Sequence, residues 1–432
     1  MSLPTPSAAP ASPASAWKQL SRYQWLVLAV AWLGWVFDSM DALIYAQVMT
    51  PALKELLGSR GTPVNIGWYG GIIFSVFVAG WALGGVAFGI LADYLGRSRA
   101  LVMTILVYAL FTGLSGFAHT WGQLCLYRFV TALGVGGEWA AGATLVAEVW
   151  PESLRVKGAG LLQCAWGAGF FLAAGVNLLL SAYSWRVMFF VGILPAFVAV
   201  YAGLRLHEPE RWTQIRGEKG GRSSPRLTLL ELFSPGMRRD TLVGSGLACV
   251  AVVGLWGATN WTPSLIYELL RPQHLDPVLV AHRVSYAVMS LNVGAILGYL
   301  ACPLLAEAWS RRGAFLVMLL GSAVSLPVAF LLPSSYGPVL GLLPIMGFFT
   351  NGIFSGFPVY LPEMYPTRLR ATGAGFCFNA GRILAAGGPF LTGYLVRQLG
   401  TFARAASSIA FIYLLGLLVL AFARETKGEV IR

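Results

Sequence analysis

The sequence predicts an all-α membrane protein of twelve transmembrane helices in two six-helix halves related by pseudo-symmetry. Three observations support this fold class: the apolar composition, the spacing of long apolar runs and an internal repeat. Of the 432 residues, 57% are hydrophobic and 11% are charged, and the mean hydropathy is +0.69. Soluble domains carry roughly 25% charged residues, so this composition excludes an ordinary soluble protein or a disordered chain. The apolar runs are continuous, which favours helices over the alternating strands of a membrane barrel.

Each span is expected where about 20 apolar residues follow one another. We predict spans at 24–49, 66–92, 100–118, 122–149, 158–181, 186–206, 242–268, 281–304, 313–332, 338–361, 372–397 and 404–423. The resulting organisation is a flexible tail (1–22), a first bundle (23–206), a cytoplasmic linker (207–241), a second bundle (242–424) and a second tail (425–432). The first apolar run is too long for a cleavable signal peptide.

The distribution of Lys and Arg predicts the orientation, because positive charge collects on cytoplasmic loops. With the N-terminus inside, the cytoplasmic segments hold 21 of the 30 basic residues, and the outer loops hold seven. The seven are Lys54, Arg60, Arg186, Arg271, Arg283, Arg397 and Arg404. This bias places both termini and the linker in the cytoplasm. It also explains the net charge of +12 without nucleic acid as a partner.

An internal repeat supports the division into halves. Residues 148–160 read E-V-W-P-E-S-L-R-V-K-G-A-G, and residues 363–375 read E-M-Y-P-T-R-L-R-A-T-G-A-G. Seven of the thirteen positions coincide at an offset of 215, after the fourth and tenth spans. A weaker echo pairs the segment 93–97 with the segment 307–311. Repeated halves are typical of carriers that bind substrate near the membrane midplane and rock to give alternating access.

Four segments carry a recognisable set of motifs. G-I-L-A-D-Y-L-G-R-S-R (Gly89–Arg99) follows the second span, and R-F-V-T-A-L-G-V-G-G-E (Arg128–Glu138) lies in the fourth. H-E-P-E-R-W (His207–Trp212) and R-E-T-K-G (Arg424–Gly428) end the two halves. Together these segments resemble the major facilitator superfamily over nearly the whole chain after the tail. The resemblance implies the major facilitator fold and a secondary transporter, not an enzyme.

Further segments resemble particular branches of that superfamily. F-D-S-M-D (Phe37–Asp41), N-A-G-R (Asn379–Arg382) and the stretch from Gly137 to Pro151 are similar to the aromatic acid/proton and sialate/proton (metabolite/proton) symporters. Those branches mostly import small carboxylates together with protons. The resemblance therefore implies proton-coupled symport of a small organic anion, either a monocarboxylate or an aromatic acid. The fifth span lacks the Gly-Pro pattern of drug/proton antiporters, which weakens an exporter interpretation.

Three acids within the spans are candidates for proton coupling. Asp38 and Asp41 are three residues apart and share one face of the first span. Two carboxylates on one helix repel, and burial favours the neutral form, so such a group can take up and release a proton. Asp38 is the deeper of the two, and either acid could instead pair with a basic group. Glu138 lies centrally in the fourth span and belongs either to this relay or to a structural pair with Arg382.

Arg128 and Arg382 are the cations within the spans, and each can hold a carboxylate with two parallel hydrogen bonds. They come from different halves, as expected for a substrate site at the interface between the halves. Arg128 could instead form a structural ion pair near the outer end of the fourth span. The remaining candidates for substrate binding are polar or aromatic residues of the spans, which also serve helix packing: Tyr45, Gln163, Trp166, Asn260 and Asn379.

A charged set at the predicted cytoplasmic ends of the spans is the candidate gate. It consists of Asp93, Gly96, Arg97, Arg99, Glu148, Arg155, Glu363 and Arg370. Asp93 and Arg97 are four residues apart, which allows a helical ion pair. Cytoplasmic loops attract basic residues, but this rule does not explain the acids that accompany them. We therefore expect the pairs to latch the halves in the outward-open state and to break on inward opening.

Other functional classes find no support in the sequence. There is no P-loop, and no His/Cys cluster is spaced for a metal, so neither a nucleotide, a metal nor another cofactor is expected. The expected partners are the small-molecule substrate, protons and the lipid bilayer of the inner (plasma) membrane, with the chain as a monomer. The alternative is a proton-coupled carrier of a neutral or cationic solute, such as a sugar, an amine or a drug-like metabolite. In that case the acids bind the solute, and Arg382 is not needed.

Overall fold

The computed structural model describes residues 17–18, 20–180, 183–210, 212–214, 225–257, 261–385, 395 and 397–429, and this part is almost entirely helical. The first half contains α2 (Arg22–Leu57), α3 (Pro63–Leu95), α4 (Arg97–Ser115), α5 (Trp121–Val149), α6 (Arg155–Leu180), α7 (Trp185–Val191) and α8 (Pro195–Arg205). The second contains α10 (Pro225–Leu232), α11 (Arg238–Gly257), α12 (Thr262–Leu270), α13 (Pro277–Ala308), α14 (Arg311–Leu331), α15 (Tyr336–Met364), α16 (Arg370–Ala385), α18 (Phe402–Ile409) and α19 (Phe411–Ala421). Short 3₁₀ turns lie at Gly58–Arg60, Arg271–Gln273 and Thr367–Leu369.

Within the described ranges, ten helical segments are long and apolar enough to cross a membrane, and each falls on one of the predicted spans. The other two predictions, 158–181 and 372–397, fall on α6 and on α16 with the residues after it. The predicted spans 186–206 and 404–423 are each divided between two helices, and the described parts of 242–268 belong to α11 and α12. Pro195 begins α8, because its ring fixes a helical φ and its missing N–H is not needed at a helix start. The all-α membrane fold is confirmed.

Local sequence determines where several of these helices begin. The hydroxyl groups of Ser21, Thr62, Thr120 and Ser310 each accept a hydrogen bond from a backbone N–H in the first turn of the helix that follows. Such caps satisfy amide groups that otherwise have no partner inside the helix. Gly96 separates α3 from α4 with a φ of 114°, a conformation that a residue with a side chain adopts only at a cost.

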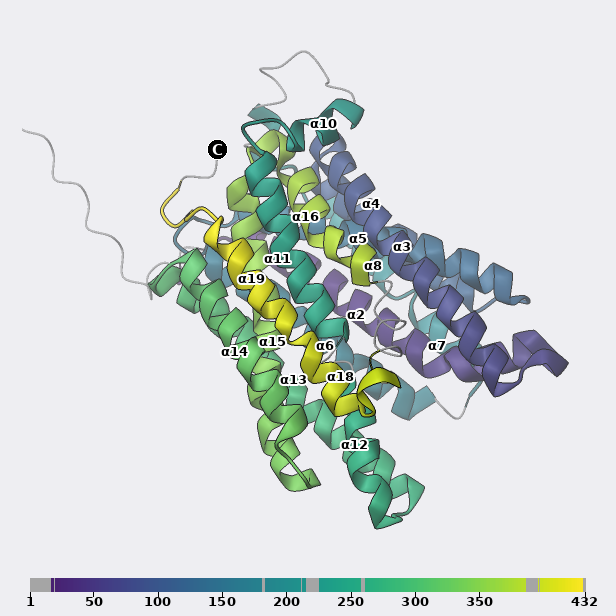
Figure 1. Ribbon diagram of the computed structural model, residues 1–432. Helices are drawn as coiled ribbons and strands as arrows, with labels where there is room; N and C mark the ends of the chain where they lie inside the picture. The colour runs from purple at the N-terminus through teal and green to yellow at the C-terminus, as the bar shows by residue number, and fades with distance from the viewer. Residues whose placement is uncertain are drawn as a thin grey trace, which may run out of the picture.

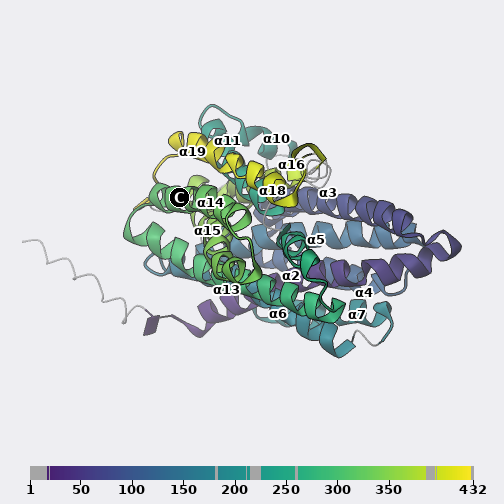
Figure 2. The same ribbon diagram turned by 60° about the horizontal axis from the view of Figure 1, so that its bottom comes forward.

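The two halves form separate bundles that meet along a central interface. In the first bundle α5 packs against α3 and α4, and α2 packs against α6; in the second, α15 packs against α13 and α14, and α16 against α11. Figures 1 and 2 show the first half, in purple and blue, beside the second half, in green and yellow. Across the interface, α3 lies against α16 and α6 lies against α13. Equivalent helices thus make equivalent contacts, as a duplicated fold requires.

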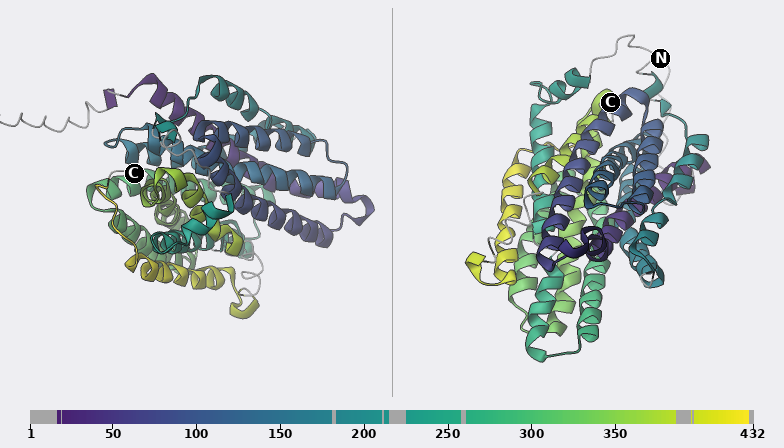
Figure 3. Two further views of the ribbon diagram at one scale, coloured as in Figure 1. Left: turned by 90° about the horizontal axis from the view of Figure 1, so that it is seen from above. Right: turned by 90° about the vertical axis from the view of Figure 1, so that its right-hand side faces the viewer.

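The halves approach most closely near one end of the molecule, which we call the linker end because α10 lies there (Figure 1). A Cβ atom added to Gly85 of α3 would lie 1.8 Å from Nδ2 of Asn379, and one added to Gly375 of α16 would lie 2.5 Å from the backbone oxygen of Gly85. Only glycine permits this contact between the backbones. At the opposite end, the tips of α2 and α3 lie apart from those of α12 and α13 (Figures 1 and 3). The protein is therefore closed at the linker end.

Candidate functional site

A buried network of charges joins the halves at the linker end. Arg370 of α16 donates to Glu148 of α5 at 2.6 Å, and the guanidinium of Arg97 lies 3.1 Å from the other oxygen of Glu148 and 3.0 Å from Asp93. Asp93 in turn accepts the backbone N–H of Thr372 at 2.8 Å and its hydroxyl at 2.6 Å. We call Asp93, Arg97, Glu148 and Arg370 the latch. The carboxylate of Asp93, which belongs to α3, thus lies against the N-terminus of α16, where the helix dipole favours a negative charge.

The latch has a counterpart within the second half. Arg311 bonds to Glu363 at 2.7 and 3.0 Å and donates to the backbone oxygen of Ala306, as Arg97 does to that of Ala92. Glu363 also accepts the hydroxyl of Thr426 at 2.6 Å. The predicted gate residue Glu363 is thus bound by two side chains of its own half, those of Arg311 and Thr426.

The other predicted gate residues take different positions. Arg155, the repeat equivalent of Arg370, lies 3.4 Å from Glu152 of its own half. Gly96 and Arg99 belong to the turn that Glu208 holds: its carboxylate accepts the backbone N–H of Ser98 and of Arg99. A carboxylate occupies the same place in the second half, where Glu425 accepts the backbone N–H groups of Arg311 and Arg312.

The sequence motifs did not single out Glu208, Arg311, Glu425 or Thr426 as candidate site residues. The signal that could have found three of them is the repeat, because Arg311 follows Arg97 by 214 residues and the two acids lie in the matching segments H-E-P-E-R-W and R-E-T-K-G. The repeat also relates an ion pair and a hydrogen bond that cross the interface. Lys157 lies 3.4 Å from Glu307, the equivalent of the contact between Thr372 and Asp93.

Asp41 and Arg128 bind each other. Two parallel hydrogen bonds of 2.8 and 2.7 Å join the guanidinium to the carboxylate, and the hydroxyl of Thr112 donates to Asp41 at 2.9 Å. The guanidinium carbon lies 4.6 Å from the ring centre of Phe77 and 5.1 Å from that of Tyr45. All of these residues belong to the first half. The geometry is that of a buried, fully formed ion pair, and it also places the candidate Tyr45 beside this pair.

Asp38 has a different environment from Asp41. Its side chain is completely buried, and neither carboxylate oxygen has a hydrogen-bond partner among the described residues. Glu138 lies beside it: the carboxylate of Glu138 packs against Gly34, one helical turn before Asp38, and interacts with the carboxyl group of Asp38. A buried, charged carboxylate that lacks partners is unfavourable, and a second acid beside it adds repulsion.

The positive charge of Arg382, on α16 of the second half, interacts electrostatically with the carboxyl group of Asp38. One of its terminal nitrogens donates to the backbone oxygen of Phe378 at 3.1 Å and to the side chain of Asn379 at 3.2 Å. Its Nε has no partner in the described part of the chain. The guanidinium carbon lies 4.3 Å from the ring centre of Trp81 on α3 and 4.6 Å from that of Phe378. The candidates Arg382 and Asn379 therefore lie together at the interface between the halves.

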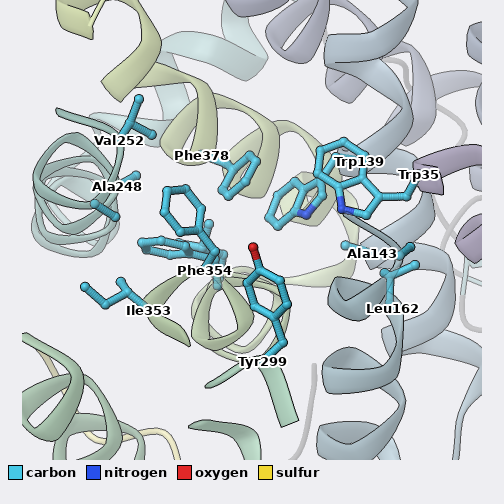
Figure 4. Packing of buried hydrophobic residues seen from close by; sticks show 14 of the residues in the cluster. Trp35, Trp139, Ala143, Leu162, Ala248, Val252, Tyr299, Ile353, Phe354 and Phe378 are labelled. Atoms are coloured by element: carbon cyan, nitrogen blue, oxygen red, sulfur yellow. The ribbon is translucent and has the colours of Figure 1, made fainter. Parts of the chain in front are cut away.

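Aromatic rings surround this point. Trp139 of the first half stacks on Phe378 of the second, with ring centres 3.7 Å apart and planes inclined by 9°. The candidate Trp166 lies 5.1 Å from Trp35 and 6.0 Å from Trp81, measured between ring centres. Figure 4 shows the rings of Trp35, Trp139, Phe354 and Phe378 gathered where the two bundles meet.

Several polar atoms within this aromatic cluster are buried without partners in the described residues. They are the indole nitrogens of Trp35, Trp81 and Trp139 and the side-chain oxygen of Gln163. Each could bond a ligand or water, because buried polar groups usually have partners. The remaining candidate, Asn260, lies outside the described residues. In the part of the chain that the structure describes, no group of His, Cys, Asp and Glu is arranged to hold a metal ion.

Two halves built of membrane-spanning helices that meet around buried charges are the arrangement of an integral multi-pass membrane transporter. The family described as sugar (and other) transporter matches residues 40–431, so the chain belongs to this family of the major facilitator superfamily, as its motifs predicted. The chain is 32% identical to a metabolite transport protein of Haemophilus influenzae over 96% of its own length and 99% of that protein.

Two further relatives are named for the substrates that they transport. The chain is 30% identical to the cis,cis-muconate transport protein of Acinetobacter baylyi, over 75% of its own length and 78% of that protein. It is 28% identical to the sialic acid transporter of Escherichia coli, over 88% and 90%. The solved structure of a proton:xylose symporter superimposes with a TM-score of 0.75 and 16% identity, covering 95% of this chain and 98% of that one. This last similarity confirms the major facilitator fold.

Proposed function

We propose that this chain is a proton-coupled symporter that carries a small organic anion, a monocarboxylate or an aromatic acid, across the inner (plasma) membrane. One observation carries the proposal: the buried carboxyl group of Asp38 has no hydrogen-bond partner among the described residues and lies beside a second acid, Glu138. Such a group exchanges a proton at a lower cost than one already committed to an ion pair. Two of the relatives, the transporters of muconate and of sialic acid, support an acidic substrate.

The proton is assigned to Asp38 and Glu138 rather than to Asp41. Asp41 accepts three hydrogen bonds, two of them from Arg128, so protonating it would break a buried ion pair. Asp38 has no such bonds to lose. Of the three acids that the sequence suggested, Asp41 then has a structural role, and Arg128 is its partner instead of a substrate ligand.

Arg382 is assigned to the substrate carboxylate. Its Nε is free of protein partners in the described region, and the faces of Trp81 and Phe378 hold the guanidinium in place. Arginine binds carboxylates through parallel hydrogen bonds, which suits an anion better than a neutral sugar. The unpartnered indole N–H groups of Trp35, Trp81 and Trp139 supply further donors for an anionic or aromatic substrate. Gln163, Trp166 and Asn379 belong to the same group of side chains.

Alternating access follows from these assignments. The latch holds the linker end closed, and the predicted orientation makes this end cytoplasmic, so the described conformation is the one that admits substrate from outside. Binding of the anion at Arg382 and of the proton at Asp38 neutralises both buried charges. A neutral centre allows the halves to rock and the bond between Arg370 and Glu148 to break. One chain contains both halves, so a monomer is sufficient.

The direct test is a measurement of internal pH in proteoliposomes loaded with a pH-sensitive dye. Carboxylates, sugars and amines are added one at a time, with protein-free liposomes as the control. We expect acidification with one class of carboxylate. In the Asp38→Asn variant we expect accumulation against a gradient to be lost while exchange of internal for external substrate continues, since the proton site is then permanently neutral.

Two outcomes would redirect the proposal. If Asp38→Asn accumulates substrate normally and Asp41→Asn does not, the proton belongs to Asp41. If carboxylates give no signal and a sugar or an amine does, the chain is a carrier of a neutral or cationic solute. The Arg382→Gln variant separates these cases, because only the anion carrier requires that guanidinium for binding.

A further inference from the structure

A second charged feature lies on the outside of the second half, away from the proposed transport site. Near the linker end, α11 and α19 enclose a groove of about 380 Å³ that is lined by Arg238, Arg239, Leu242, Val243, Val419 and Phe422. Figure 1 shows α19, in yellow, beside α11, in teal, and Figure 2 shows the same two helices side by side. The groove is therefore basic at its end and apolar along its walls.

The two acids near this groove form their ion pairs with a third arginine, Arg424. Asp240 and Glu429 both bind Arg424, at 3.0 and 3.3 Å. Arg239 uses its Nε to donate to the backbone oxygen of Phe422 at 3.0 Å, which fixes the guanidinium at the mouth of the groove. Arg238 is exposed and has no acidic partner within the described residues. Three arginines thus face two acids, and the excess charge is positive.

The apolar wall continues from the groove into the membrane. On α19, Phe411, Leu415, Leu418 and Phe422 follow one another at spacings of three and four residues, so they share one face, and they are 53–69% exposed. Leu242 of α11 is 62% exposed beside them. In a membrane protein this face contacts acyl chains. The distinguishing feature is that this face ends at two arginines, one of which, Arg239, is held by a hydrogen bond to the backbone of Phe422.

We propose that the groove between α11 and α19 binds an acidic glycerophospholipid, with its headgroup phosphate between Arg238 and Arg239 and one acyl chain along the exposed face of α19. Basic pockets at the ends of membrane helices bind anionic headgroups in this way. The combination of charge and apolar wall selects a lipid over a free anion, because a free anion gains nothing from Leu242 and Phe422.

A neighbouring groove provides the internal comparison. On the other side of α19, α14 and α19 enclose a groove of about 480 Å³, which includes Trp309, one arginine (Arg312) and one acid (Glu425). This groove is similar in size, and the charges of its lining residues balance, since it has one arginine and one acid. It should accept lipids without preferring acidic ones.

The test is a lipid titration of the full-length protein in detergent, followed by native mass spectrometry. Phosphatidylglycerol is compared with phosphatidylcholine of the same acyl chains. We expect the wild-type protein to bind phosphatidylglycerol more tightly. The Arg238→Gln/Arg239→Gln double variant should bind it about 30-fold more weakly, since each arginine near a headgroup contributes about fivefold. Arg312→Gln is the matched control and should change the affinity less than twofold.

A second variant tests the apolar wall without changing the charge. Leu242→Trp should fill the groove and weaken phosphatidylglycerol binding, and it protects the conclusion if the double variant does not fold. A photoactivatable phosphatidylglycerol should label peptides from α11 and α19. Equal wild-type affinity for the two lipids, an unchanged double variant, or an equal loss in Arg312→Gln would overturn the proposal. Displacement by millimolar inorganic phosphate would also overturn it, because the groove would then be a site for a free anion.

Discussion

The ion pair between Asp41 and Arg128 allows a quantitative test of its structural role. Both side chains are buried, two hydrogen bonds join them, and three aromatic rings surround the guanidinium. In Arg128→Met the carboxylate of Asp41 remains buried with only the hydroxyl of Thr112 as a partner. Breaking a buried pair in this way costs about 3–5 kcal/mol. Replacing both partners removes the unpaired charge, so Asp41→Asn/Arg128→Met should recover roughly half of that loss.

The measurement is a double-mutant cycle on purified protein in detergent, with thermal unfolding followed by tryptophan fluorescence. For a chain of this length, a loss of about 3–5 kcal/mol corresponds to a decrease in Tm of roughly 3–6 °C. If the double variant is as unstable as Arg128→Met alone, the unpaired carboxylate of Asp41 is not the cause of the lost stability, and the ion pair does not have the role assigned to it. Transport per folded molecule completes the test: a stable double variant with a normal KM excludes Arg128 as a substrate ligand.

Three further predictions concern the linker end. The first uses Ala140→Cys as a reporter and measures the rate at which a maleimide labels this cysteine. Adding Arg370→Gln should raise that rate at least severalfold, because the bond to Glu148 no longer holds the halves together. An unchanged rate would show that the latch does not control opening. Gly85→Leu should raise the same rate further, since the added side chain collides with α16, and unaltered labelling together with wild-type stability would contradict the close approach of the backbones. Glu425→Gln should cost about 1 kcal/mol at neutral pH and nothing in acid. Partial burial opposes ionisation of Glu425, but the hydrogen bonds that it accepts from backbone N–H groups outweigh this effect and hold its pKa below the usual value. The carboxylate therefore contributes its full stabilisation above the unfolded pKa of about 4.3. This stabilisation is lost as the pH falls through the lowered pKa of the folded protein. Thermal unfolding of both proteins at about pH 6 and about pH 3 measures the difference, and a gap in Tm that persists in acid would be inconsistent with this mechanism.

Sequence patterns predicted the helices well, because long apolar runs leave few alternatives in a membrane. Ten predicted spans coincide with apolar helices of sufficient length. The breaks inside two spans were not predicted, since the residues before Pro195 and at Ala410 interrupt helices without interrupting hydrophobicity. Hydrophobic periodicity reports burial in the membrane, and it carries little information about local bends.

Partner choice was the part of the site that the sequence left open. The pattern selected Asp38, Asp41, Arg128 and Arg382 as unusual charges, but it could not decide that Arg128 binds Asp41 and leaves Asp38 without a partner. That outcome depends on which faces of α2 and α5 meet. The repeat was more informative, because Arg97 and Arg311 perform the same local task at equivalent positions. It failed only where the halves differ, since Arg370 reaches Glu148 of the first half while Arg155 lies against Glu152 of its own.

The stack of Trp139 on Phe378 gives the protein an intrinsic optical reporter. The two rings lie 3.7 Å apart and belong to opposite halves, so any motion that opens the linker end must separate them. The indole would then exchange an aromatic face for water, and its emission would move to longer wavelength. Subtracting the spectrum of a Trp139→Phe protein isolates this signal from the other 14 tryptophans. The fluorescence emission of Trp139 thus reports opening of the linker end without an attached dye.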